Sequence, residues 1–307
     1  MSAGLRRRQP STRHAGRAGD YFRGHKLKEQ EGQKLKSMDP KITNQSGVPN
    51  RDMPFPENST VVVAHGAWAD GSSWKEVILL LDKQGLQVVA APLPLTSLSD
   101  DIVALNGTIA RTKGPVIVAG HAYGGAVIAG ANEERVKALV YVAALAPEEG
   151  ETVAQVFYRD EAHPQAPKLA PDKDGWIWMP NEGFSDAFAH HATADQIALC
   201  KAVQRPIAVK CIQEPAPRPA WKSKPSWFLI AEEDRMIHPK TQHFMSRRMD
   251  AKMHSSRVDH SPMLTAPDLV VDVILEAARE SLSLAPSHIF EEPRWTAADP
   301  QPKEIRK

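Results

Sequence analysis

The sequence is poor in cysteine, in net charge and in long apolar runs, and each shortage excludes a class of protein. Its 307 residues include two cysteines, Cys200 and Cys211, which are too few for a disulfide scaffold. Two cysteines are enough for a single disulfide bond, but a reducing compartment is the simpler interpretation. A formal net charge of +1 gives no overall attraction to nucleic acid or anionic membranes. The longest apolar runs, Val116–Ala119 and Ala138–Ala146, are too short to span a bilayer.

The amino-terminal residues lack the apolar segment that a secretory signal carries. They are rich in Arg, Lys, Gly and Gln, so they have little apolar surface to bury on folding. We predict a disordered basic extension over residues 1–55, a folded domain over 56–285, a tail over 286–307 and a cytoplasmic location. An upstream start codon or added residues would explain the extension. An organelle transit peptide is the alternative, because the first nineteen residues contain Arg and Ser but no acid.

Short apolar runs alternate with amphipathic segments through the middle of the chain. The runs predict buried strands over residues 60–64, 86–90, 116–119, 138–142, 226–231 and 253–258. Apolar faces with helical spacing predict helices starting near residues 74, 99 and 123 and covering 239–249 and 266–281. This alternation predicts an α/β fold with a mostly parallel central sheet flanked by helices on both faces. In the helix near residue 99 we expect Ile102, Val103, Leu105 and Ile109 to face inward.

The stretch from Pro147 to about Lys224 breaks this rhythm, since it has many prolines and no strand pattern. We predict that this insertion forms a cap over the strand ends. Trp176 and Trp178 are expected in the core of the cap or along an apolar pocket. We interpret His190 and His191 as surface residues, because adjacent residues on a helix do not face one site. We therefore predict no metal site.

One six-residue segment carries the main chemical signal. Residues 120–125 read Gly-His-Ala-Tyr-Gly-Gly, and they follow a predicted strand and open a predicted helix. The nucleophile elbow G-x-S-x-G occurs in this context, with the nucleophile in a strained positive-φ turn. Its neighbours two residues before and after must be small, and Gly120 and Gly124 occupy those places. Ala122 therefore stands at the nucleophile position.

A second segment, His65-Gly66-Ala67-Trp68, follows the predicted strand 60–64. The two segments together resemble the α/β-hydrolase superfamily, in particular its small esterase and hydroxynitrile-lyase-like branch, over about residues 60–278. The resemblance implies an α/β-hydrolase fold with a cap insertion, and hydrolysis of a small, partly apolar ester, lactone or amide without cofactor or metal. It implies a small-molecule substrate or ligand. With the net charge and the short apolar runs we expect no nucleic-acid or membrane partner, and the sequence does not determine the oligomeric state. The backbone N–H groups of Ala67 and Tyr123 would form the oxyanion hole.

The acid and the base are expected later in the chain, in the order that the family uses. Asp234 follows the predicted strand 226–231, and His260 follows the last predicted strand. His260 would be the general base, and Asp234 would fix its tautomer. The neighbouring acids Glu232 and Glu233 stay open as alternatives to Asp234.

Three other histidines lie close to these segments in the sequence. We interpret His65 and His121 as framework donors that brace the loops around the oxyanion hole, not as bases. His238 stands where a helix is expected to start, so we interpret it as a structural residue.

Ala122 departs from the family pattern, because a methyl group cannot attack a carbonyl. Three interpretations stay open: a Ser→Ala variant of a serine hydrolase, a relative that binds a small ligand without turnover, or a cofactor-free lyase, isomerase or hydrolase. The third would use the Asp234–His260 dyad as general base. Ser72, Ser73 and Ser261 lie near these segments in sequence, but none is on the elbow.

Overall fold

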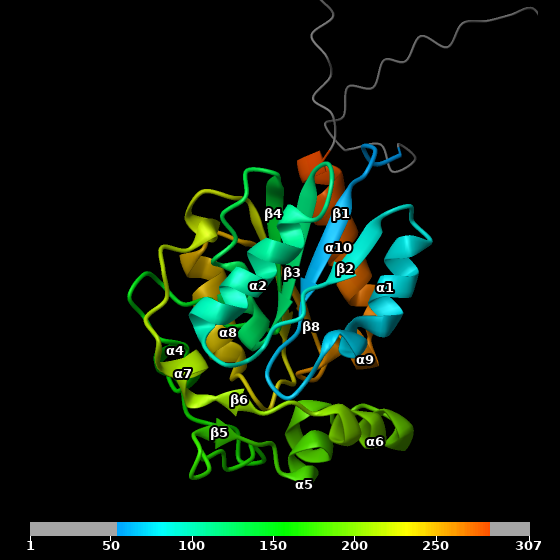
Figure 1. Ribbon diagram of the computed structural model, residues 1–307. Helices are drawn as coiled ribbons and strands as arrows, with labels where there is room; N and C mark the ends of the chain where they lie inside the picture. Colours follow the sequence, from blue (N-terminus) through cyan, green and yellow to red (C-terminus); the bar gives the residue numbers. More distant parts are fainter. Residues whose placement is uncertain (1–53, 283–307) are drawn as a thin grey trace, which may run out of the picture. The chain divides into compact units, whose positions relative to one another are not determined.

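A parallel sheet of six strands organises the part of the chain that the computed structural model describes, residues 54–282 (Figure 1). Apart from Pro54 and Phe55, the predicted extension lies outside the described residues, as does the predicted tail. The strand order is β2-β1-β3-β4-β7-β8. The strands are β1 (Thr60–Ala64), β2 (Gln87–Ala90), β3 (Val116–His121), β4 (Val136–Val142), β7 (Ser226–Ala231) and β8 (Lys252–Ser256). The predicted mostly parallel sheet is confirmed.

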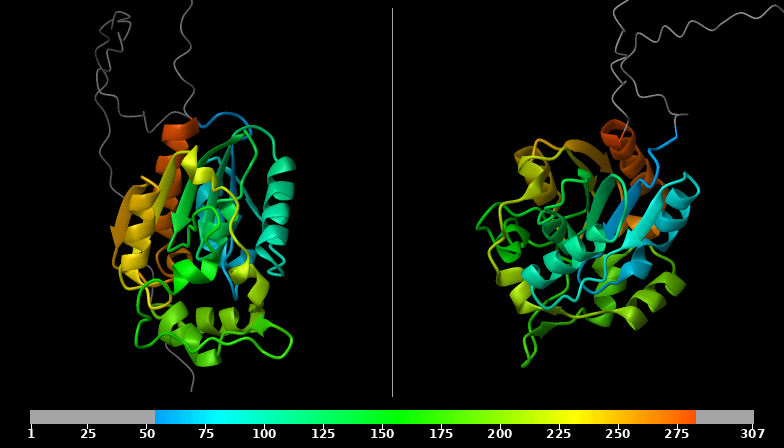
Figure 2. Two further views of the ribbon diagram at one scale, coloured as in Figure 1. Left: turned by 90° about the vertical axis from the view of Figure 1, so that its left-hand side faces the viewer. Right: turned by 45° about the horizontal axis from the view of Figure 1, so that its top comes forward.

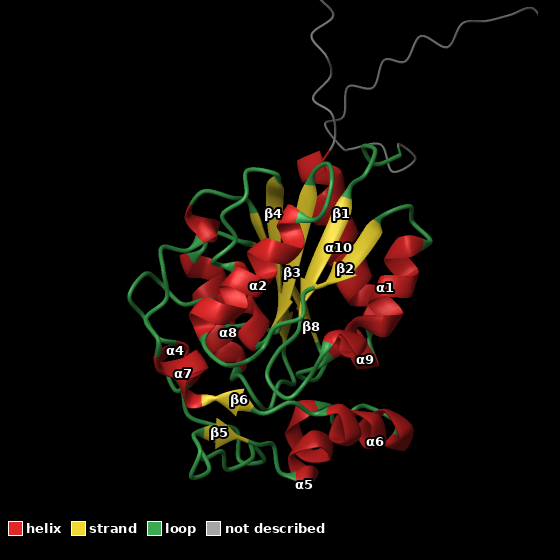
Figure 3. Cartoon of the chain, in the orientation of Figure 1, coloured by secondary structure: helices red, strands yellow, loops and turns green. Residues whose placement is uncertain are grey.

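Helices cover both faces of the sheet, as Figures 2 and 3 show. Alternate residues of β1 pack on opposite faces: Val61 and Val63 pack in one apolar cluster, and Val62 and Ala64 in the other. This two-sided burial explains why the central strands read as unbroken apolar runs. On the Val61 face lie η1 (Gly71–Trp74), α1 (Lys75–Asp82), α9 (Pro262–Thr265) and α10 (Pro267–Leu282), and on the Val62 face lie α2 (Leu98–Ala110), α3 (Tyr123–Ile128) and α8 (Pro239–Arg248).

Helix α2 differs from its prediction. It begins after Ser97, whose hydroxyl caps it by accepting a hydrogen bond from the Asp100 N–H at 3.0 Å. The prediction that Val103 faces inward is wrong, since its side chain is 72% exposed. Asp101 is fully buried instead. Leu105 and Ile109 face inward as predicted. Asp101 is buried on the same side because its carboxylate accepts hydrogen bonds from the Leu95 N–H and the Tyr123 hydroxyl, which offset the cost of burying it.

The insertion between β4 and β7 contains short elements only. It includes a small antiparallel pair, β5 with β6, so the prediction that this stretch has no strand is wrong. In Figure 1 this pair and the helices α5 and α6 lie beyond the carboxyl ends of the parallel strands. The elements are α4 (Val153–Phe157), β5 (Trp176–Ile177), α5 (Asn181–Gly183), η2 (Phe184–Phe188), α6 (Ala194–Val203), β6 (Ile207–Ala208), α7 (Val209–Gln213) and η3 (Ala220–Lys222).

The structure bears on two expectations drawn from the composition, one about a disulfide bond and one about a membrane span. Cys200 and Cys211 are both free thiols, so the single bridge left open by the sequence does not form. Within residues 54–282 no helix combines the length and the apolar character needed to cross a membrane.

Candidate active site

The turn between β3 and α3 has the geometry of a nucleophile elbow. Ala122 has φ 48° and ψ −119°, a conformation that side-chain-bearing residues rarely adopt. The chain around it is tightly packed. A Cβ on Gly120 would lie 2.5 Å from the Gly124 carbonyl oxygen, and one on Gly124 would lie 2.6 Å from that of Ala64. Only glycine fits at either place, as the sequence motif predicts.

The loop after β1 lies against this elbow. A Cβ on Gly66 would approach the Ala122 Cβ to 3.0 Å, so the backbones of the two segments are in close contact. Among the hydrogen bonds of the described residues, neither the Ala67 N–H nor the Tyr123 N–H has an acceptor. Tyr123 opens α3, where the first N–H groups have no partner within a helix. Two free donors are thus available beside residue 122.

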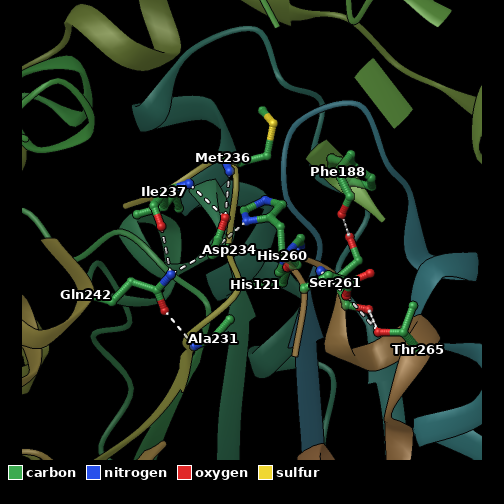
Figure 4. Close-up of polar contacts among 11 residues, drawn as sticks. His121, Phe188, Ala231, Asp234, Met236, Ile237, Gln242, His260, Ser261 and Thr265 are labelled. Atoms are coloured by element: carbon green, nitrogen blue, oxygen red, sulfur yellow. Dashed lines mark hydrogen bonds and ion pairs between the residues drawn. The ribbon is translucent and has the colours of Figure 1, made fainter. Parts of the chain in front are cut away.

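His260 and Asp234 form a buried pair at the ends of β8 and β7 (Figure 4). His260 Nδ1 and Asp234 Oδ2 are 2.8 Å apart. The Asp234 carboxylate is held by the start of its own turn, because Oδ1 accepts from the N–H groups of Met236 at 2.7 Å and Ile237 at 2.9 Å. A carboxylate held in this way fixes the orientation and tautomer of the His260 ring, so its other nitrogen, Nε2, is free to contact a ligand.

Gln242 on α8 completes the support of this pair, and the sequence motifs do not reveal it. Its Nε2 donates to Asp234 Oδ2 at 2.7 Å and to the Ile237 carbonyl at 2.9 Å, while its Oε1 accepts from the Ala231 N–H at 3.0 Å. The Asp234 carboxylate therefore accepts hydrogen bonds on both oxygens, two on each. An inward Gln eight residues after an acid is the one sequence signal that could have indicated this role.

An apolar pocket connects the elbow with the pair. Ala122 and His260 both line it, together with Ala67 and Tyr123. It holds about 590 Å³ of empty space, including its open mouth. None of its lining residues is Ser, Thr or Cys. The rest of its wall is mainly aliphatic and aromatic, and the insertion contributes Val153, Phe157, Leu169, Ile177, Ile207 and Ile212.

The insertion is tied to the site at two points. The Trp68 indole N–H donates to the Ile177 carbonyl at 2.9 Å, which joins the loop after β1 to β5. Phe188 of η2 lies edge-on to the His260 ring, with centroids 5.4 Å apart, and its carbonyl accepts from the Ser261 hydroxyl at 2.6 Å (Figure 4). Trp178 is 50% exposed, so its predicted place in a core or pocket wall is wrong, and Ile177 points inward instead.

Two buried histidines brace the surrounding backbone. His121 Nε2 donates to the His260 carbonyl at 2.8 Å, and His65 Nδ1 donates to the Gly66 carbonyl at 2.9 Å. Burial lowers the pKa of His65, and it lowers the pKa of His121 well below its ordinary value. Both rings are therefore neutral near pH 7, which fits the predicted role of framework donors.

Tyr123 is anchored to α2 by Asp101, which the sequence analysis did not single out. The Tyr123 hydroxyl donates to Asp101 Oδ2 at 2.6 Å, and the Leu95 N–H donates to Oδ1 at 2.7 Å. Burial raises the pKa of the Asp101 carboxyl. The same burial raises the pKa of the neighbouring Cys211 thiol to about 12, so this thiol stays protonated and does not supply a nucleophile.

The other sequence candidates lie elsewhere. Glu232 contacts His243 and Glu233 contacts Arg257, so Asp234 is the acid that meets His260. Ser72 bonds Asp70, and neither it nor Ser73 lines the pocket. His238 caps α8, where its Nδ1 accepts from the Lys240 N–H.

Comparison with known proteins gives matches over most of the chain. The sequence profile of the family described as "Alpha/beta hydrolase family" matches residues 61–273. The α/β hydrolase nvfD of Aspergillus novofumigatus is 23% identical over 247 residues, which are 73% of this chain and 98% of nvfD.

Solved structures share the fold at low identity. A mutant of tomato methylketone synthase I has a TM-score of 0.64 and 19% identity, covering 73% of this chain and 99% of that one. A pyrethroid hydrolase from Sphingobium faniae JZ-2 has a TM-score of 0.61 and 18% identity, covering 72% of this chain and 97% of that one.

Proposed function

Because the chain belongs to the alpha/beta hydrolase family, we propose that its pocket binds a small, largely apolar ester or related carbonyl compound. His260 and Asp234 act on this compound as an acid–base pair. The observation that carries the proposal is the support of Asp234, which accepts four hydrogen bonds while His260 lines the same pocket as Ala122. The relatives include a protein named as a hydrolase of pyrethroids and one named as a methylketone synthase.

The proposed roles follow from the contacts of each group. His260 Nε2 takes a proton from water or from the substrate, and the imidazolium that forms is stabilised by the Asp234 carboxylate 2.8 Å from Nδ1. The N–H groups of Ala67 and Tyr123 donate to the substrate carbonyl oxygen as negative charge develops on it. The apolar wall excludes water from the rest of the substrate and strengthens these interactions.

In this proposal Ala122 occupies the place of the family's serine, so no acyl-enzyme forms on residue 122. The chain as it stands would work through general-base catalysis by His260. With a serine at position 122, the same framework would perform esterase chemistry: the hydroxyl attacks the carbonyl carbon, His260 takes its proton, and the alcohol leaves with that proton. Water activated by His260 then attacks the acyl-enzyme, which releases the acid and regenerates the serine.

Introducing a serine at position 122 tests this proposal. Removing the serine of a comparable protease triad costs about 10⁶ in kcat. We therefore expect Ala122→Ser to raise kcat for a short-chain nitrophenyl ester on the order of 10³-fold or more over the present chain. The matched control is His260→Ala in the serine background, which should abolish the gain.

Three further results would distinguish the functions. Turnover by the unaltered protein that His260→Ala removes would support the general-base function. A serine variant that is folded, yet no faster than the parent on a broad ester panel, would contradict the hydrolase framework. Saturable ligand binding without turnover by either protein would favour a binding function.

A further inference from the structure

Three potential metal-ligating side chains meet outside the apolar pocket. One ligand atom from each of His190, His191 and Glu233 lies within 4.8 Å of the other two. The histidines follow η2 in the insertion, and Glu233 precedes Asp234 in the loop after β7. The interpretation of His190 and His191 as surface residues agrees with the exposure of His191, but the argument that adjacent histidines cannot face one site is wrong here.

The backbone explains why these adjacent histidines converge. The η2 turn ends at Phe188, and Ala189 has φ −149° and ψ 61°, which is not helical. The helical rule that separates neighbouring side chains does not apply there. The two ring centroids are 4.3 Å apart.

Contacts outside the cluster hold the Glu233 side chain and the backbone of Glu233 and His191. The Glu233 N–H donates to the Val258 carbonyl, and its Oε1 accepts from Arg257 Nε at 2.9 Å. This leaves Glu233 Oε2 directed at His191, 3.2 Å from Nε2. The His191 N–H donates to Asp259 Oδ2 at 2.9 Å. Such outer contacts orient ligands in protein metal sites.

One ring nitrogen of His190 is unpaired in the described part of the structure. Its Nδ1 is buried and has no hydrogen-bond partner among the described residues. Buried polar atoms are nearly always paired, so an orphan atom calls for an explanation such as an absent ion or water. The cleft around it is also lined by Glu232, Glu233 and Arg235 and by two further histidines, His163 and His238.

We propose that His190, His191 and Glu233 bind a divalent transition metal ion of the zinc type, with a fourth position open to water. Two imidazoles and one carboxylate form a donor set that suits zinc. The ion would replace the contact between His191 and Glu233. It would tie the insertion to the loop that carries Asp234. This site does not depend on the proposed function, because none of its three ligands lines the apolar pocket.

Metal binding by the full-length chain tests the proposal. After treatment with a chelator, the protein is titrated with Zn²⁺ by calorimetry and with Co²⁺ by visible ligand-field absorption. We expect saturable Zn²⁺ binding and a Co²⁺ spectrum of low coordination number. His190→Ala and Glu233→Gln should each weaken Zn²⁺ binding by about tenfold or more, since even outer contacts of such sites matter this much.

The matched control is His254→Ala, which removes a histidine paired with Glu276 elsewhere on the chain and should leave the affinity unchanged. Thermal unfolding without metal checks that each variant is folded. If His190→Ala fails to fold, Glu233→Gln provides the test by itself. The proposal is overturned if the parent chain binds no Zn²⁺, or if Glu233→Gln and the control bind as the parent does.

Discussion

The two halves of the candidate site keep their shape by different means. The elbow around Ala122 depends on backbone packing, with a positive φ and two glycines pressed against carbonyl groups. The half around Asp234 depends on hydrogen bonds, two at each carboxylate oxygen. A site built by the backbone can lack its reacting atom and still keep its geometry. A site built by buried polar groups cannot lose one partner without leaving another unpaired.

The largest expected effect on stability comes from a substitution in the half of the site that depends on backbone packing. In Gly124→Ala the new methyl carbon would lie 2.6 Å from the Ala64 carbonyl oxygen and 2.7 Å from that of His65. Because both obstacles are backbone, we expect a loss of about 3 kcal/mol or more in the free energy of unfolding. Denaturant titration measures it. The control, Gly107→Ala in α2, meets no atom within 4 Å and should stabilise by about 0.5–1 kcal/mol. Equal effects would contradict the packing argument.

The polar half is tested at Gln242, which is fully buried. Gln242→Leu keeps a similar volume but removes one donor to Asp234 and the acceptor of the Ala231 N–H. We expect a loss of about 1–3 kcal/mol. In the Ala122→Ser background the pH dependence of kcat should shift as well, because the acid that holds His260 loses a hydrogen bond. An unchanged pH profile would mean that Gln242 supports the fold alone.

The burial of His121 should make the free energy of unfolding decrease in acid. Its folded pKa lies well below its ordinary value because of burial. Below about pH 6.5 the unfolded imidazole gains a proton while the folded one does not, so stability falls as pH decreases, by up to about 1.4 kcal/mol per pH unit. His65 acts in the same direction. In His121→Asn the stability measured from about pH 7 to pH 5.5 should fall less steeply. An identical slope would contradict this account.

The smallest expected effect concerns the strain at Ala122. Glycine adopts φ 48° and ψ −119° without the steric cost that alanine has there. Ala122→Gly removes this strain but also makes the unfolded chain more flexible, which offsets part of the gain. We expect the free energy of unfolding to rise by about 1 kcal/mol. The opposite case is Ala198→Gly at an exposed position inside α6, which should destabilise by about 1 kcal/mol. Denaturant titration compares the two, and a destabilised Ala122→Gly protein would show that the elbow is not strained.

Local patterns predicted much of the fold and the placement of the site. The strands around the sheet centre and the pairing of Asp234 with His260 follow from apolar runs and from motif order. The inward position of Asp101, the exposure of Val103 and the support from Gln242 depend on tertiary hydrogen bonds, which periodicity does not encode. The meeting of His190 and His191 depends on the irregular backbone at Ala189.

The pair β5–β6 has a consequence for how such a protein changes over time. Ile177 and Ile207 lie opposite each other in this pair, and both line the pocket. They belong to a segment that leaves after β4 and returns before β7, while β4 and β7 pair directly with each other. The segment can thus be exchanged or resized while the register of the main sheet is kept. Ligand choice can therefore change at Ile177 and Ile207, whereas the contact of Phe188 with His260 couples the neighbouring part of the insertion to the acid–base pair.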